Sequence, residues 1–458
     1  MRRDRIAPDP LNIMPGPFTG RLAAWLSETA SHRSFFRAVG AISAVRLTGG
    51  LLLFLSQMLL ARWMGVEAFG VYSVAWAWVA VLGTLGGLGF AGTSVRFLAT
   101  YRAQGAQAQI RGLLRFGRLL TLASASFVAA CGLLVVTAVA SGSPYGSALQ
   151  WAVLGIPLLA LLALEAAYAR GFGWMALSAV AEQIGRPAAL ILFAWLLMKL
   201  GTGTTARGYV MICVLAYLVA ASAQHVVVRK RTHALIGAGP AESDTRPWLR
   251  VSGAMLLLTG AQMVRMNTDL VLVGALLAPA DVGVYTAAVR TATLVSFVLT
   301  VTSVVAQPGL ASLHAENRRA ELAHFVATTT RSSFFVSLVI GTLLGLCGQP
   351  VLALFGPGFT AAYPALLILI AGHVLVAASG PLTSLLTMTG HHAPAAVVYC
   401  LSAISNGLLN LLLIPQFGIV GAAVASGLNL LLTQIALAVT VRQRLGLSFS
   451  ALGIRARR

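Results

Sequence analysis

The sequence predicts an all-α integral membrane protein with about twelve transmembrane helices in two six-helix lobes around a central cavity. Composition is the first observation: of 458 residues, 58% are hydrophobic and 10% are charged, and the mean hydropathy is +0.85. Soluble domains carry about a quarter charged residues, because their surfaces must stay hydrated. The other two observations are the number of apolar runs and the positions of the basic residues between them.

Twelve apolar runs are each long enough to cross a bilayer as a helix, which takes about 20 residues. Short connections rich in Gly and Pro, such as 141–148 and 356–362, predict tight turns between antiparallel neighbours. The expected spans are 44–62, 71–93, 119–140, 149–169, 180–200, 208–228, 251–277, 283–306, 332–355, 363–387, 394–414 and 418–441.

Loop charge predicts the orientation of these spans. Of the 32 Lys and Arg residues, 27 fall on the side of the N-terminus, and only Arg62, Lys199 and Arg207 fall on the other. Because cytoplasmic loops collect Lys and Arg, we expect both termini to be cytoplasmic. The net charge of +20 then follows from topology, and it does not predict a nucleic-acid partner.

An internal repeat divides the chain. FGVYSVAWAWVAVL at 69–82 aligns with VGVYTAAVRTATLV at 282–295, so that Gly70 and Tyr72 fall on Gly283 and Tyr285. Six spans in each half give the repeats one orientation, which predicts two parallel lobes related by an axis along the membrane normal. The expected parts are an N-terminal tail (1–43) with an interfacial helix, a first lobe (44–228), a linker (229–250), a second lobe (251–441) and a basic tail (442–458).

Three segments carry a family resemblance. RLTGGLLLFLSQMLLARWMGVEAFG and the residues that follow it (46–99) resemble the first two helices of polysaccharide flippases in the multidrug/oligosaccharidyl-lipid/polysaccharide (MOP) exporter superfamily. NTDLVLVGALLAPADVGVYTAAVR (267–290) is similar to the start of their second lobe, and NLLLIPQFGIVGAAVASG (410–427) to their last hairpin.

The resemblance implies a MATE-like flippase fold whose central cavity opens alternately to either side of the cell inner membrane. In the O-antigen flippase-like branch the cargo is a polyprenyl-pyrophosphate-linked oligosaccharide, such as an O-antigen, capsule or exopolysaccharide repeat unit. The implied partners are therefore this lipid-linked oligosaccharide, membrane lipid, and a polysaccharide polymerase and ligase.

Charged residues inside the spans identify the candidate site. Arg265 and Arg290 lie within the spans 251–277 and 283–306, where a charge costs a few kcal/mol unless it faces a cavity or a partner. Guanidinium groups bind the paired oxygens of a pyrophosphate bidentately. At helical spacing, further polar residues lie on the same helix faces as the candidate arginines. The candidate substrate-binding residues are Arg265, Arg290, Arg46, Asp269, Gln57 and Thr293.

Structural interpretations of the same residues stay open. Arg265 and Asp269, at i and i+4, are spaced for an ion pair within one helix. Arg46 has the position of a positive-inside anchor, and Arg290 that of a buried structural contact. Glu165 and Glu182 lie at helix ends, where a salt bridge to Arg170 or Arg186 is favoured over proton coupling.

Several functions are disfavoured by what the sequence lacks. The only lysines, Lys199 and Lys230, lie in no Walker-type loop, so a P-loop ATPase is excluded. No catalytic triad or paired-carboxylate motif predicts an enzyme. The four cysteines are widely spaced and predict no metal site or disulfide framework. No cofactor is expected, while coupling to a proton or sodium gradient stays open. The alternatives are a lipid II-type flippase, a cation-coupled multidrug exporter and a non-transporting membrane scaffold.

Overall fold

The computed structural model describes residues 17–140, 142–199, 205–316, 318–450 and 453–456. Two compact units divide the chain at Ala44, and the second unit, Val45–Arg458, contains every feature discussed below. Residues 17–43 are helical as the beginning of α1, and the expected interfacial face of this segment lies outside the described side chains.

The first lobe consists of long helices broken at a few positions. Gly65 has a φ of 78°, a conformation that residues with a Cβ rarely adopt, and it divides α1 into two membrane crossings. A turn of π-helix, η1, lies directly before α7. The elements are α1 (Pro17–Gly86), α2 (Phe90–Ala103), α3 (Gln107–Val139), α4 (Gly146–Ala152), α5 (Gly155–Gly171), α6 (Met175–Val180), η1 (Ala181–Gly185), α7 (Arg186–Lys199) and α8 (Ala206–Ile236).

The second lobe repeats this plan. Gly418, with a φ of 57°, follows Pro415 and divides α15 into two crossings. The elements are α9 (Thr245–Leu276), α10 (Pro279–Ala315), α11 (Arg319–Leu346), α12 (Gly348–Ala353), η2 (Phe359–Ala362), α13 (Tyr363–Ser379), α14 (Leu382–Met388) and α15 (His392–Leu445). A short antiparallel hairpin follows, in which β1 (Leu447–Ser450) pairs with β2 (Gly453–Ala456).

The helix lengths account for the expected twelve crossings. Within the described residues, eight helical segments are long and apolar enough to span a membrane, and two of these are the broken helices α1 and α15. The remaining two crossings are α9 and α10, of 32 and 37 residues, which carry the charged residues of the candidate site. The protein is thus an all-α multi-pass membrane protein, as the sequence predicts.

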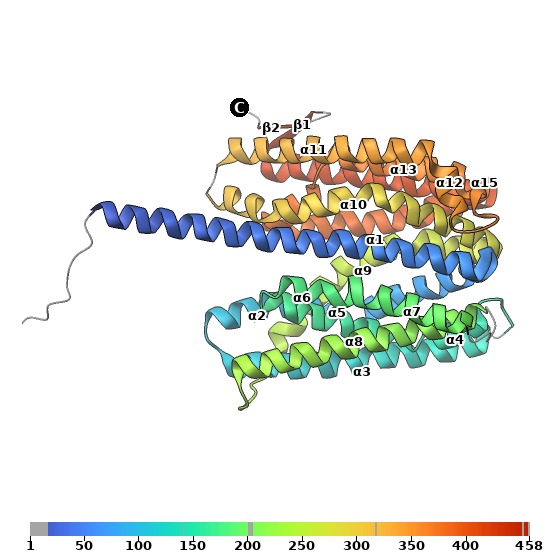
Figure 1. Ribbon diagram of the computed structural model, residues 1–458, viewed down its shortest axis with the longest axis horizontal. Coiled ribbons are helices and arrows are strands. Elements are labelled where there is room, and N and C mark those ends of the chain that lie inside the picture. The colour runs from blue at the N-terminus through green and yellow to red at the C-terminus, as the bar shows by residue number, and fades with distance from the viewer. Residues whose placement is uncertain (1–16, 141, 200–204, 317, 451–452, 457–458) are drawn as a thin grey trace, which may run out of the picture. The chain divides into compact units, whose positions relative to one another are not determined.

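Helix α9 and the part of α1 after Val45 lie at the junction of the two lobes (Figure 1). In Figure 1, α10, α11, α13 and α15 form one group, and α2 to α8 form the other. The segment 237–244 joins α8 to α9, and we call the membrane side on which it lies the linker end. The opposite side, where α1 turns at Gly65 and α9 meets α10, is called the turn end. Helices α8 and α9 extend into residues 229–250, the segment expected as a linker. The boundaries that the sequence predicts for the parts of the chain therefore stay a prediction.

The repeat is visible as a contact between the lobes at the turn end. A Cβ added to Gly70 would lie 1.8 Å from the carbonyl oxygen of Pro279, and one added to Gly283 would lie 2.0 Å from that of Val66. Gly70 and Gly283 are equivalent under the repeat offset of 213 residues, and so are Val66 and Pro279. The lobes therefore meet reciprocally, backbone against backbone, through the segments that the repeat identified.

Helix α9 is bonded to both lobes. Near the linker end, Trp248 donates its indole N–H to the hydroxyl of Tyr101 (2.9 Å), and the Ser252 hydroxyl donates to the carbonyl oxygen of Leu88 (2.6 Å). Further along, the side-chain amide of Asn406 on α15 donates to the carbonyl oxygen of Arg265 (2.9 Å). Helix α9 is thus hydrogen-bonded to the first lobe near its start and to the second lobe at Arg265.

Candidate functional site

Arg186 is a buried cation in the first lobe. It is the first residue of α7, directly after the π-helical turn, and its exposed fraction is 8%. Its guanidinium carbon lies 5.0 Å from the ring centroid of Tyr217 on α8. Its Nε is buried without a hydrogen-bond partner, and no ion pair of Arg186 exists among the described residues. A π-helical turn next to such a residue is typical of functional sites.

Arg290 brings a second cation to the same place from the other lobe. It lies on α10 and interacts electrostatically with Arg186 and with the ring hydroxyls of Tyr72 and Tyr217. Its Nε is also buried without a partner. Two guanidinium groups from opposite lobes therefore share one neighbourhood, and we call Arg186 and Arg290 the arginine pair.

Polar groups of α1 complete the surroundings of the arginine pair. Tyr72 is buried, its hydroxyl lies 3.5 Å from the Cys213 sulfur, and it interacts electrostatically with both arginines. Gln57, with 5% of its surface exposed, interacts with the same hydroxyl. Gln57 and Arg290 thus both neighbour the Tyr72 hydroxyl, while their role in binding stays a prediction.

Arg265 lies in a separate cavity of about 160 Å³ inside the second lobe. Asp269 and Thr293 line the same cavity, and the Arg265 guanidinium carbon is 5.7 Å from the ring centroid of Tyr399. The other lining residues are Met266, Val289, Ser296, Leu369, His373, Asn406, Ser426, Asn429 and Leu430.

Asp269 is held by hydroxyl groups and forms no ion pair with Arg265. Its carboxylate accepts hydrogen bonds from the hydroxyls of Tyr285 (2.8 Å) and Ser426 (3.1 Å). The i, i+4 ion pair considered from the sequence is therefore wrong, and the Nε of Arg265 is left without a partner. Asp269 still interacts electrostatically with both Arg265 and Arg290, so the cavity and the arginine pair lie near one another.

Arg46 stands apart from the other candidates. It lies at the start of the first crossing of α1, nearer the linker end, and interacts electrostatically with Arg170. Its Nε too is buried without a partner. The six candidates thus divide into an inter-lobe group, a cavity group and one residue toward the linker end.

Sequence reasoning placed Glu165 incorrectly and Arg186 only in part. Arg186 begins α7 and interacts electrostatically with Glu182, but it forms no ion pair with that carboxylate and is buried against Tyr217. Glu165 pairs instead with Arg118 (Nε to Oε1, 2.7 Å) and with His225 (Nδ1 to Oε1, 2.7 Å). The sequence feature that could have pointed to this site was Tyr72, because it lies in the internal repeat.

The arrangement is suited to an anion with several oxygen atoms. The arginine pair and Arg265 supply three guanidinium groups. Of the carboxylates nearby, Asp269 is occupied by hydroxyl donors, and Glu182 interacts electrostatically with Arg186 without forming an ion pair. Arg–phosphate contacts are charge-assisted and often bidentate. No cluster of metal-ligating side chains occurs among the residues that the structure describes.

Comparison with known proteins decides the family. The model of the polysaccharide biosynthesis protein family matches residues 35–314, more than half of the chain. The chain belongs to this family. No curated protein sequence matches it significantly.

Solved structures share the fold of this polysaccharide biosynthesis family member at low identity. An inward-facing multidrug resistance MATE family transporter of the MOP superfamily aligns with a TM-score of 0.70 at 13% identity, over 88% of this chain and 98% of that one. The lipid II flippase MurJ in an inward closed conformation aligns with a TM-score of 0.64 at 14% identity, over 88% and 87%. A MOP superfamily transporter from Pyrococcus furiosus, described as having a binding pocket of reverse polarity, aligns with a TM-score of 0.67 at 13% identity, over 89% and 95%.

Together these findings make the protein a member of the polysaccharide biosynthesis protein family that shares the fold of MOP superfamily transporters.

Proposed function

We propose that this protein moves a polyprenyl-pyrophosphate-linked oligosaccharide from the cytoplasmic to the outer face of the inner membrane by alternating access. The observation that supports the proposal most is the arginine pair. It consists of one guanidinium group from each lobe, each with a buried Nε that has no hydrogen-bond partner, and neither forms an ion pair with a carboxylate in the described part of the chain.

Charge balance favours a pyrophosphate as the bound group. Burying an unpaired charge in an apolar setting is costly, and two neighbouring cations also repel each other. A pyrophosphate with about two negative charges offsets both costs, because its oxygens accept hydrogen bonds from both guanidinium groups. Cargo binding would therefore favour the approach of the two lobes.

The conformation fits one step of the cycle. The lobes touch at the turn end through Gly70 and Gly283, and Arg62 donates there to the carbonyl oxygen of Leu354 (3.4 Å). Loop charge predicts that the turn end is the outer side, so this state is closed toward the outside. The outward step carries negative charge out of a cell with a negative interior, which is favourable by about 2.3 kcal/mol per charge per 100 mV.

The proposal is tested by flipping in proteoliposomes. A polyprenyl-pyrophosphate-linked monosaccharide with a fluorescent group is added, and its exposure in each leaflet is followed by chemical quenching from outside. Arg290→Gln removes a charge-assisted contact that contributes about 1.5–3 kcal/mol, so the rate is expected to fall about 10- to 150-fold. Arg444→Gln, at an exposed position near the end of α15, is the control and retains the wild-type rate. An unchanged rate for Arg290→Gln would overturn the proposal.

The same assay separates the alternatives. A cation-coupled multidrug exporter needs a carboxylate to attract its cargo, whereas Glu165 and Asp269 are engaged by partners within the protein and Glu182 lies in the field of Arg170 and Arg186. A lipid II-type flippase would use the same arginine pair with a different saccharide, so competing saccharides identify the cargo. A scaffold without transport would retain its function in Arg290→Gln.

A further inference from the structure

An apolar cavity of about 470 Å³ lies in the first lobe, outside the site described above. It is enclosed by the second crossing of α1, by α3 and by α4 with the start of α5. Small residues leave the space open, among them Ala75, Gly132 and Ala152, and no charged residue lines it. A cavity of this kind inside a membrane protein is filled by hydrocarbon, because water finds no polar partners there.

The cavity opens toward the lipid. On its rim, Phe127 has 69% of its surface exposed and Val139 has 82%. An apolar cavity of roughly 150 Å³ holds one benzene molecule. By this measure the space accommodates about 18 carbon atoms, which corresponds to three or four isoprene units.

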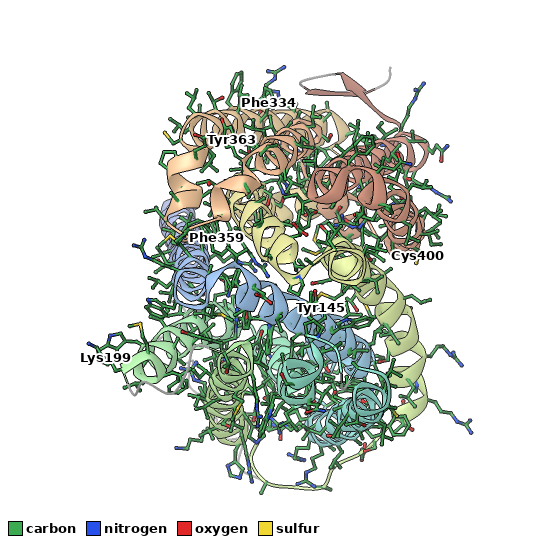
Figure 2. All side chains as sticks on the ribbon, turned by 90° about the vertical axis from the view of Figure 1, so that its right-hand side faces the viewer. Tyr145, Lys199, Phe334, Phe359, Tyr363 and Cys400 are labelled. Carbon is green, nitrogen blue, oxygen red and sulfur yellow. The ribbon has the colours of Figure 1, made fainter. Side chains whose placement is uncertain are left out.

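The cavity borders the seam between the lobes. Val74 of α1 packs against Gly274 of α9, and the next residue, Ala75, is a wall of the cavity. Tyr145 at the start of α4 also approaches Gly274, and Figure 2 shows Tyr145 where the helices of the two lobes meet. One turn further along α4, Leu149 lines the cavity.

The cavity also lies close to the arginine pair along α1. Ala75 follows Tyr72 by one helical turn, and Tyr72 interacts with both arginines. When the headgroup of a lipid is bound between the lobes, its chain leaves the site through the seam between them. The seam formed by α1 and α9 leads that chain directly to the cavity.

We propose that this cavity binds part of the isoprenoid chain of the cargo lipid, so that the first lobe contributes to binding both the headgroup and the chain. This inference rests on the proposed function. It assigns the first lobe a role in selecting cargo by its chain, whereas the arginine pair selects the pyrophosphate.

Photo-crosslinking tests the position of the chain. p-Benzoylphenylalanine is placed at Phe127, and as a control at Phe335, an exposed phenylalanine on α11 of the other lobe. The protein in phosphatidylethanolamine–phosphatidylglycerol nanodiscs receives radiolabelled polyprenyl pyrophosphate. We expect at least about fivefold more label at position 127, reduced by unlabelled polyprenyl pyrophosphate and not by added phosphatidylglycerol. Equal labelling, or equal competition by phosphatidylglycerol, would overturn the inference.

Filling the cavity gives a second test. A Cβ on Gly132 would meet only Val153 Cγ1, at 3.5 Å, so Gly132→Leu is compatible with folding and extends into the cavity. The matched control is Gly345→Leu on α11, where a Cβ would meet only Leu367 Cδ2, at 3.7 Å. We expect Gly132→Leu to weaken binding of a long-chain polyprenyl pyrophosphate about tenfold without changing binding of inorganic pyrophosphate.

The outcomes distinguish this inference from the proposed function. If Arg290→Gln weakens binding of both ligands while Gly132→Leu weakens neither, the isoprenoid chain lies elsewhere and the proposed function stands. If Arg290→Gln leaves both affinities unchanged, the proposed function itself is wrong.

Discussion

Replacing Gly70 with alanine is expected to open the turn end of the protein. The added Cβ would lie 1.8 Å from the Pro279 carbonyl oxygen, whereas real Cβ contacts are essentially never shorter than 3.0 Å. The two backbones must therefore separate by at least 1.2 Å along that line, and neither is the flexible end of a side chain. The strain exists only while the lobes touch, so it acts on the conformational equilibrium rather than on the folding of either lobe.

The size of the shift follows from the cost of overpacking, which is about 1–3 kcal/mol. Applied to the closed state alone, this cost changes the ratio of open to closed molecules about 5- to 150-fold. Gly283→Ala breaks the equivalent contact, and its Cβ would lie 2.0 Å from the Val66 oxygen. Because one separation relieves both contacts, the double variant is expected to shift the equilibrium by less than the sum of the single shifts.

The assay is a distance measurement across the seam. Spin labels at Glu67 and Ala280, which are exposed and equivalent under the repeat, report lobe separation by pulsed electron paramagnetic resonance. We expect a second, longer distance in Gly70→Ala and Gly283→Ala. Gly253→Ala, whose Cβ would meet no atom within 4 Å, is the control and retains the wild-type distance. Unchanged distances in both seam variants would refute the argument that this backbone contact holds the outer side closed.

Two further predictions concern buried charges. Combining Arg186→Gln with Arg290→Gln is expected to reduce the flipping rate by less than the product of the two single effects, because both residues bind one ligand. Flipping rates of the single and double variants in proteoliposomes measure this coupling. Glu165→Gln leaves Arg118 as an uncompensated cation and is expected to destabilise the fold by about 3–5 kcal/mol, measured by unfolding in detergent, whereas Glu67→Gln at an exposed position changes stability by less than about 0.5 kcal/mol.

The fold was predictable because bilayer physics constrains it strongly. Apolar runs of fixed length and one-sided loop charge define spans and topology with no knowledge of packing. The same reasoning failed for Arg186, because loop charge counts a basic residue by its place in the sequence. The structure places it more than a helical turn inside the membrane-spanning segment Met175–Lys199, against Tyr217.

The candidate site was predictable only in part, since helical spacing shows which residues share a face and not what that face meets. Helical spacing was compatible with an ion pair between Arg265 and Asp269, but the Asp269 carboxylate instead accepts hydrogen bonds from hydroxyl groups on α10 and α15. The arginine pair joins two lobes that are distant in sequence, and no local pattern reports such a contact. The repeat was the exception, because its two copies proved to be the surfaces that touch.

The attachment of α9 to both lobes indicates where the proposed transport cycle would deform the protein. Ser252 is bonded to the first lobe and Arg265 to the second, so relative rotation of the lobes must be absorbed in the twelve residues between them. Gly260 lies within this interval and weakens the helix where bending is required. We therefore expect the segment 253–264 to bend when the lobes rotate, so that its stiffness affects the rate of the proposed cycle.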